Sequence, residues 1–235
     1  MKEPSAVDGT PVSVPSITSQ TYDRLRAAIL SGDLAPGTKL KIDDLRRRFI
    51  AGASPIREAL SLLTSDHLVE RIDQRGFRVA HVSELDFSEL LKTRAWLEER
   101  ALRESIEYGD RDWEEAVVLA HYHLLRTPRT LADEERNRSR LARSSAEWEQ
   151  RHRKFHFSLL SACGSSILIR FCNQLYDQNI RYRFLSSRAS YPKRDINEEH
   201  TDIMRAALDR NPDAAVAALL THYRRTGDFL SAGID

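Results

Sequence analysis

Two histidines stand four residues apart in the stretch 148–160, which reads WEQRHRKFHFSLL. If this stretch is a helix, His152 and His156 lie one turn apart on the same side, close enough to share one ligand. Neutral imidazole binds transition metals, but a hydrogen-bonded pair without a metal is the more common arrangement. The pair therefore raises the question of a metal site, and the rest of the chain has to answer it.

Two later histidines occupy apolar-facing positions of predicted helices. His200 in EEHTDIMRAAL is in phase with Ile203 and Ala207, and His222 in LLTHYRRTGDFL is in phase with Leu219. Four inward imidazoles would form a cage that suits zinc, nickel, cobalt or copper. We therefore expect one transition-metal ion per subunit, zinc or nickel above all, with the ligands His152, His156, His200 and His222.

The other histidines show no such pattern. His121 and His123 are two apart and so face different sides of a helix, and His67 and His81 flank the N-terminal region without partners. We expect each of the four to be a surface or linker residue. Cys163 and Cys172 have no metal-ligand spacing and are expected to be buried thiols.

The elements that must position the four candidate ligands are helices. From Asp86 onward the apolar residues recur with helical spacing, which predicts an all-α antiparallel bundle over residues 87–235 as the metal- and effector-binding domain. The charged segment 127–145 is expected to be a mobile loop or a solvated extension of a helix. Asn211 and Pro212 are expected to be the N-cap and first residue of the last helix.

The N-terminal region has a different pattern. Residues 19–80 predict three short helices and a β-hairpin around Asp73 to Gly76, with Ser54 as the N-cap of the third helix and Pro55 at its first position. This order is that of a winged helix-turn-helix, in which the third helix enters the major groove of DNA. Residues 1–18 are expected to be a flexible arm and residues 81–86 a linker. The predicted fold class is mainly α.

Charge supports this assignment only locally. The whole chain has 36 Lys and Arg against 35 Asp and Glu, whereas residues 19–80 have eleven basic against eight acidic residues. The alternative interpretation is that the basic triplet 46–48 is merely a solvated helix face and the hairpin a lid. No run of eighteen apolar residues and no signal-peptide core occur, so we expect a cytoplasmic protein.

The stretches YDRLRAAILSGDLAPGTKL and GASPIREALSLLTSDHLVERIDQRGFRVA closely resemble the DNA-binding domain of GntR-type bacterial transcription regulators. That family often has an Arg before the proline of the third helix, where this chain has only small residues, AGASP. The difference shifts the expected base contacts to Arg57, Ser54 and the wing. The expected DNA-binding residues are Lys41, Arg46, Arg48, Ser54, Arg57, Arg75 and Gly76.

The helical half resembles the FCD effector domain of the FadR subfamily, through HRKFH, EEHTDIMRAAL and LLTHYRRTGDFL. His152 stands where that family usually has an acid, which removes a negative charge and favours softer transition metals over calcium or magnesium. In another arrangement His152 turns away and a water completes the shell. The resemblance also implies Arg94 as an inward effector-binding residue that Glu98 could orient, with Arg181 and Arg183 as candidates for the distal end of a longer acid.

These features together predict a homodimeric transcription regulator, a repressor, that releases a palindromic operator when a small carboxylic acid, such as a dicarboxylate, binds at the metal. We expect no enzyme, because no HExxH, GxSxG or phosphate-binding glycine loop accompanies the histidines. Two alternatives stay open. Turnover of an acid or ester would indicate a metal-dependent hydrolase with an accessory DNA-binding domain. An acid that changes stability without changing operator affinity would indicate an architectural DNA binder with a structural metal.

Overall fold

The computed structural model describes residues 16–72, 75–129, 138–186 and 195–231, with two compact units that divide between His81 and Val82. The fold class is the expected one, mainly α with a small sheet. Most of the arm expected over residues 1–18 lies outside the described residues. Ile17 and Thr18 belong to the first helix, which Ser16 caps by accepting a hydrogen bond from the Ser19 amide.

The N-terminal unit contains three helices and a three-stranded sheet. The elements are α1 (Ile17–Leu30), β1 (Lys39–Leu40), α2 (Ile42–Phe49), α3 (Ala53–Ser65), β2 (Val69–Ile72) and β3 (Gly76–Val79). The central strand β3 pairs antiparallel with both β1 and β2, and the buried side chains of α1 and α3 form the core. The order of three helices and a hairpin is therefore confirmed. Strand β1 was not predicted, because a strand of two residues shows no recognisable alternation in the sequence.

The start of α3 differs from the prediction. The helix begins at Ala53 with Gly52 as its N-cap, so Ser54 is not the cap and Pro55 is not the first helical residue. Proline is tolerated in the first turn because the amides there have no intrahelical partner, so Pro55 did not fix the position of the start. The Ser54 hydroxyl lies 3.0 Å from Glu58 Oε1 and donates to it.

The turn between α1 and the sheet depends on Gly37. Its φ is +76°, which side chains rarely adopt, and its amide donates to Val79 O at 2.9 Å. A Cβ at this position would lie 2.9 Å from Cε1 of His81. The backbone conformation therefore favours glycine, whereas the exposed His81 ring could move aside for a side chain.

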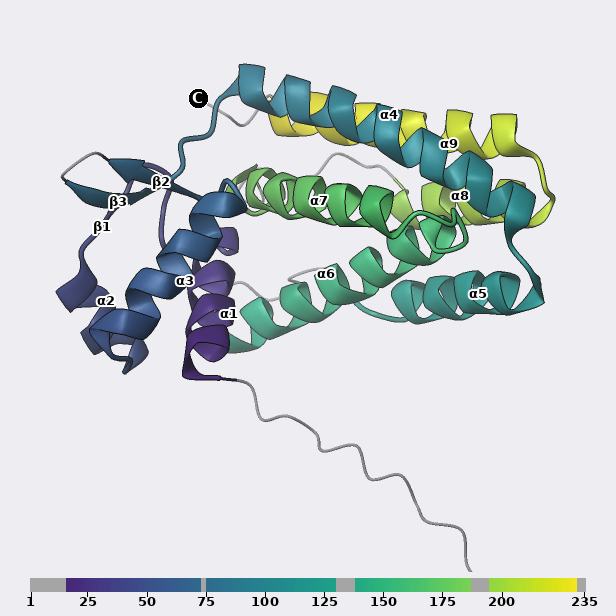
Figure 1. Ribbon diagram of the computed structural model, residues 1–235. Coiled ribbons are helices and arrows are strands. Elements are labelled where there is room, and N and C mark those ends of the chain that lie inside the picture. The colour runs from purple at the N-terminus through teal and green to yellow at the C-terminus, as the bar shows by residue number, and fades with distance from the viewer. Residues whose placement is uncertain (1–15, 73–74, 130–137, 187–194, 232–235) are drawn as a thin grey trace, which may run out of the picture. The chain divides into compact units, whose positions relative to one another are not determined.

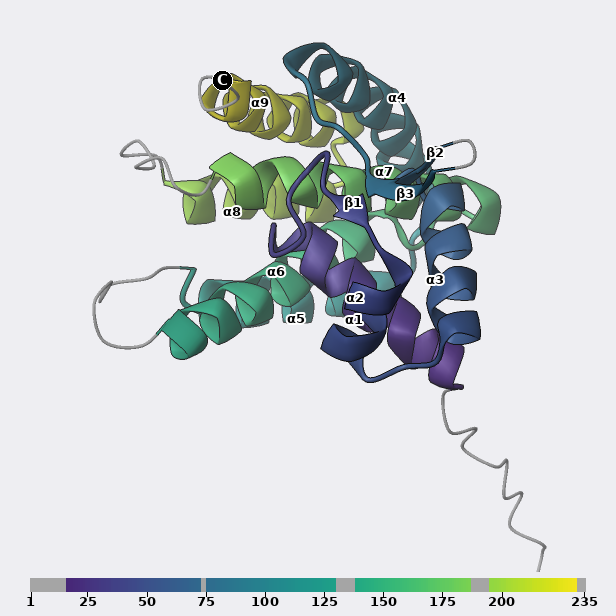
Figure 2. The same ribbon diagram turned by 90° about the vertical axis from the view of Figure 1, so that its left-hand side faces the viewer.

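The second unit is a bundle of α4 (Glu84–Tyr108), α5 (Arg111–Leu125), α6 (Arg138–Leu160), α7 (Ser166–Ser186), α8 (Ile196–Leu208) and α9 (Pro212–Ser231). Figures 1 and 2 show these helices stacked in tiers, with α4 beside α9, then α7 and α8, then α5 and α6. None of the described helices is long and apolar enough to cross a membrane.

Three boundaries of the bundle bear on the predictions. Helix α4 begins inside the segment expected as a linker, and Ser83 caps it by accepting from the Asp86 amide. Asn211 Oδ1 accepts from the Ala214 amide, which confirms it as the cap of α9. Helix α6 begins at Arg138, so the charged segment 127–145 is partly a helix extension, and its residues 130–137 lie outside the described part. Cys163 and Cys172 are buried free thiols, as expected.

Candidate metal centre and DNA-binding surface

The four predicted histidine ligands meet inside the helical unit. His152 and His156 come from α6, His200 from α8 and His222 from α9, and all four are buried. One ring nitrogen from each residue lies within 4.8 Å of the others. Nε2 of His152 and Nε2 of His156 are 3.1 Å apart. Two nitrogens at about 2.0–2.1 Å from one shared ion can lie about 3 Å apart, so this spacing suits a pair of ligands.

Three of the four imidazoles have a partner on the nitrogen that faces away from the other rings. Nδ1 of His222 lies 2.9 Å from Glu199 Oε2, and Nδ1 of His152 lies 2.9 Å from the Tyr176 hydroxyl. Nδ1 of His156 lies 3.5 Å from the Tyr223 hydroxyl, a long contact. Such partners fix the ring orientation of metal-binding histidines.

His200 is the exception. It is fully buried, and neither of its ring nitrogens has a hydrogen-bond partner among the described residues. A buried polar group left unpaired costs about 1–3 kcal/mol, so an orphaned imidazole beside three others requires an explanation. A metal ion bound to one of its nitrogens would supply one.

Burial makes the rings suitable ligands. The pKa values of His152, His156 and His200 lie well below the ordinary 6.5, because burial disfavours the charged ring and neighbouring histidines and arginines oppose a further positive charge. The rings are therefore neutral at pH 7 and keep a lone pair. A set of four nitrogens fits a transition metal, whereas calcium and magnesium prefer oxygen ligands and do not fit.

Arg94 lies next to this cluster, in the interior of α4. Its Nε donates to Glu98 Oε1 at 2.8 Å and its Nη2 to the Tyr223 hydroxyl at 3.1 Å. The orientation of Arg94 by Glu98 is therefore as predicted. Burial opposes the charge, but Glu98 and the tyrosines Tyr223 and Tyr176 outweigh it and raise the pKa of Arg94. The guanidinium also lies over the Tyr223 ring, 4.6 Å from its centre.

The two arginines predicted on α7 do not lie together. Nη1 of Arg183 is 3.1 Å from Nδ1 of His152, and its Nη2 donates to Glu149. Arg181 is also buried, but it stands two residues before Arg183 and therefore lies on a different face of the helix, beside Tyr182. The structure thus brings Arg183 to the cluster.

His121 was predicted to be a surface or linker residue, and this is wrong. It is only 6% exposed, its Nε2 lies 3.1 Å from Thr201 Oγ1, and its ring contacts Phe155. Trp113, Val117 and Leu124 are buried on the same helix, so His121 belongs to a helical stripe that was present in the sequence. His67 and His81 are exposed and His123 is half-buried.

Sequence reasoning did not single out Glu149, Tyr176 and Tyr223, which contact the histidines and arginines of the site. Glu149 stands three residues before His152 and therefore shares its helix face, a pattern that could have identified it. Tyr176 comes from α7 and carries no local pattern, since only packing brings it to His152.

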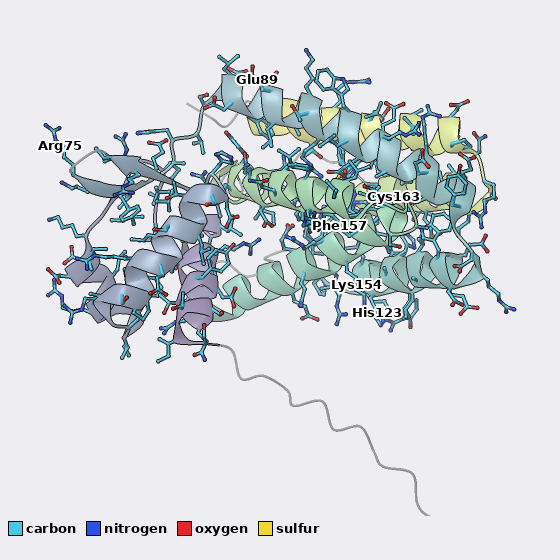
Figure 3. All side chains as sticks on the ribbon, in the orientation of Figure 1. Arg75, Glu89, His123, Lys154, Phe157 and Cys163 are labelled. Atoms are coloured by element: carbon cyan, nitrogen blue, oxygen red, sulfur yellow. The ribbon has the colours of Figure 1, made fainter. Side chains whose placement is uncertain are left out.

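The predicted DNA-binding residues are all exposed in the N-terminal unit. Lys41, Arg46 and Arg48 lie at or in α2, Ser54 and Arg57 on α3, and Arg75 and Gly76 at the end of the hairpin. Figure 3 shows Arg75 pointing outward from that end.

The arginines of this surface differ in their partners. Arg46 pairs with Asp43 at 3.3 Å and Arg48 with Asp33 at 3.7 Å. Arg57 has no hydrogen bond or ion pair within the described part of the chain, so its guanidinium is available to a ligand.

Two family models match the two units. Residues 17–79 match the bacterial regulatory proteins of the gntR family, and residues 89–225 match the FCD domain. Both matches coincide with the regions that the sequence likened to these families. The curated relatives below are likewise transcription regulators and not enzymes.

Two relatives are similar over most of their length. The HTH-type transcriptional regulator BphR of Paraburkholderia xenovorans (strain LB400) is 40% identical over 93% of this chain and 88% of its own. The HTH-type transcriptional repressor GlaR of Escherichia coli (strain K12) is 32% identical over 86% and 90%. The solved structure of E. coli McbR/YncC covers 94% of this chain and 100% of its own with a TM-score of 0.74 at 19% identity, which shows a shared fold.

Proposed function

This chain belongs to the GntR family of bacterial regulatory proteins and carries an FCD domain, and from that premise we propose that it is a repressor controlled by an organic acid. As a homodimer it binds a palindromic operator in the cytoplasm, and a small carboxylic acid at a metal site in the helical unit releases it. The name of GlaR, a repressor 32% identical to this chain, supports the direction of regulation.

The single observation that carries the metal site is His200, a fully buried imidazole whose two nitrogens have no described partner and which faces three other imidazoles. His152, His156, His200 and His222 would hold one zinc or nickel ion. When bound, the ion supplies a Lewis-acidic position for an oxygen of the effector.

Charge supports an acid as the effector. Four neutral ligands bring no negative charge to a divalent ion. The carboxylates behind the histidines are each paired with an arginine already, so an anion is favoured beside the ion. Arg94 donates to Tyr223 beside His156, and Arg183 contacts His152. Both guanidinium groups lie 5.2 Å from the centre of the Tyr176 ring, and each can donate to a carboxylate. Two arginines suit an acid with carboxylates at both ends, such as a short dicarboxylate.

Different residues of the DNA-binding surface are proposed to contact bases and phosphates. Arg57 on α3 has no described partner and would read a base in the major groove, while the exposed arginines of α2 would contact phosphates. Arg75 at the hairpin end would contact the flanking backbone.

The first test measures metal in the purified protein. Protein prepared without chelator and reloaded with nickel or zinc is expected to contain about one ion per subunit, and His200→Ala is expected to lose it. His123→Ala, at a half-buried position outside the cluster, is the matched control. Wild-type protein without metal after reloading would refute the metal site.

The second test measures release from DNA. Operator fragments bound to the wild type are titrated with a series of short mono- and dicarboxylates, and the same acids are applied to Arg94→Ala. We expect release of the wild type by a member of this series, and operator binding without release for the variant. Normal release of the variant would place effector sensing elsewhere, and stabilisation by an acid without any release would favour the architectural DNA binder.

A further inference from the structure

A carboxylate stands behind each of three histidines in the cluster. Glu199 contacts His222 directly, through its Oε2 at 2.9 Å from Nδ1. Glu149 acts through a tyrosine, because Tyr176 donates to its Oε1 at 2.7 Å and lies 2.9 Å from Nδ1 of His152. Glu98 accepts from Tyr223 in the same way, and Tyr223 lies near Nδ1 of His156.

The contacts of Tyr176 favour one position for the ring proton of His152, and a contact of Arg183 opposes it. The single hydroxyl proton of Tyr176 is donated to Glu149, so the Tyr176 oxygen can only accept from His152. Nδ1 of His152 then carries the proton, and Nε2, which faces His156, keeps the lone pair that a metal needs. Arg183 opposes this state, because its Nη1 lies 3.1 Å from the same Nδ1 and can only donate.

The carboxylates behind the histidines are also the partners of the candidate effector-binding arginines. Arg183 donates to Glu149, and Arg94 donates to Glu98. Each arginine therefore holds a carboxylate that reaches a histidine through a tyrosine. An acid that draws an arginine to itself leaves that carboxylate more strongly engaged with its tyrosine.

We propose that Tyr176 and Tyr223 are positioning residues that couple acid binding to metal binding through the chains Glu149–Tyr176–His152 and Glu98–Tyr223–His156. The inference rests on the proposed function and assigns the regulation of that site. With Arg183 engaged by an acid, Glu149 pulls on the Tyr176 proton, Tyr176 accepts more strongly from Nδ1, and Nε2 of His152 becomes a better ligand. Because coupling between two sites is reciprocal, the metal equally favours the acid.

The two chains differ in expected strength. The contact of Tyr176 with His152 is a hydrogen bond of ordinary length, 2.9 Å, whereas Tyr223 lies 3.5 Å from His156. Tyr176 is therefore expected to dominate.

The test uses nickel alone and needs no effector. Nickel affinity is measured by competition with a chelator in the full-length wild type, Tyr176→Phe, Tyr223→Phe and Tyr182→Phe. Tyr182 lies on the same helix but packs against Phe87, with ring centres 4.5 Å apart and a tilt of 30° between the rings, and serves as the control. We expect about 10–100-fold weaker binding for Tyr176→Phe, a smaller loss for Tyr223→Phe and a change below about twofold for the control.

Arg183→Met imitates an acid that has taken the arginine away, which makes the coupling itself measurable. The variant should bind nickel more tightly than the wild type, and this gain should shrink at least severalfold when Tyr176→Phe is also present. An equal gain in both backgrounds would show simple charge repulsion and overturn the proposal. Nickel affinity of Tyr176→Phe within twofold of the wild type would overturn it too.

Two controls keep the outcome interpretable. If Tyr176→Phe does not fold by circular dichroism, Glu149→Gln replaces it, since this change keeps a hydrogen-bond acceptor but removes the charge, and the same loss of affinity is expected. A wild type that binds no nickel refutes the metal site of the proposed function. A wild type that binds nickel beside an unaffected Tyr176→Phe refutes only the coupling.

Discussion

Lowering the pH from 7.5 to 5 is expected to destabilise the metal-free protein steeply. His152, His156 and His200 have pKa values well below 6.5 in the folded protein, chiefly because they are buried. In the unfolded chain the same rings take up protons near pH 6.5. Between these two pKa values the unfolded state binds more protons, so the free energy of unfolding falls as the pH falls below about 6.5.

The slope of this dependence follows from the number of rings. Each histidine that stays neutral in the folded protein contributes at most about 1.4 kcal/mol per pH unit below pH 6.5, and the pKa of the buried His121 is lowered as well. Domains are typically stable by about 5–15 kcal/mol, so the summed contributions of these rings remove a large part of that stability as the pH falls toward 5. His222, which faces Glu199, is not included in this sum.

His200→Leu tests the magnitude, since His200 has no described hydrogen bond to lose and leucine fills a similar volume. Urea unfolding followed by circular dichroism at several pH values should show that the variant takes up about one proton fewer on unfolding than the wild type does. His123→Leu should leave the slope unchanged. Equal slopes for wild type and His200→Leu, or stability independent of pH between 7 and 5, would refute the picture of a neutral buried cluster.

Two further outcomes concern the N-terminal unit. Arg57→Ala should weaken specific operator binding by about 1–3 kcal/mol, whereas Arg46→Ala should weaken binding to all DNA about equally. Fluorescence anisotropy with operator fragments and unrelated fragments distinguishes the two effects. Equal effects of both variants on both kinds of DNA would contradict these different roles. Ile50 is the C-cap that follows α2; its φ is +52° and its side chain is 88% exposed. Ile50→Gly should therefore stabilise the protein by up to about 1 kcal/mol in thermal unfolding, and a loss of stability would show that its side chain has a packing role.

The parts of the fold that were predictable are those with local chemical causes. Apolar spacing and the Asn211 cap located helices, and alternation located the hairpin. Strand β1 was missed because two residues carry no periodicity, and it exists only through its pairing with β3. The start of α3 was misplaced because a proline near a helix start restricts the first turn without choosing one residue in it.

In the candidate metal centre, too, only features with a local sequence pattern were predictable. A histidine that is in phase with the apolar residues of a helix is predicted to be buried, so the convergence of the four rings could be anticipated. The same helical spacing relates His121 to Val117 and Leu124, and it would have placed His121 in the core. The partners of the rings depend on which helix packs against which. Tyr176 reaches His152 across 24 residues, and no local spacing announces such a contact.

The order of the two units along the chain has a consequence during synthesis. The DNA-binding unit ends at His81, whereas the fourth ring of the cluster is on α9, the last described helix. During translation the DNA-binding unit is therefore complete well before the helical unit that is proposed to bind the effector. A chain trimmed by a protease before α9 would keep every residue of the N-terminal unit but lose His222, one of the four predicted metal ligands, and the helix that packs against α4 and α8.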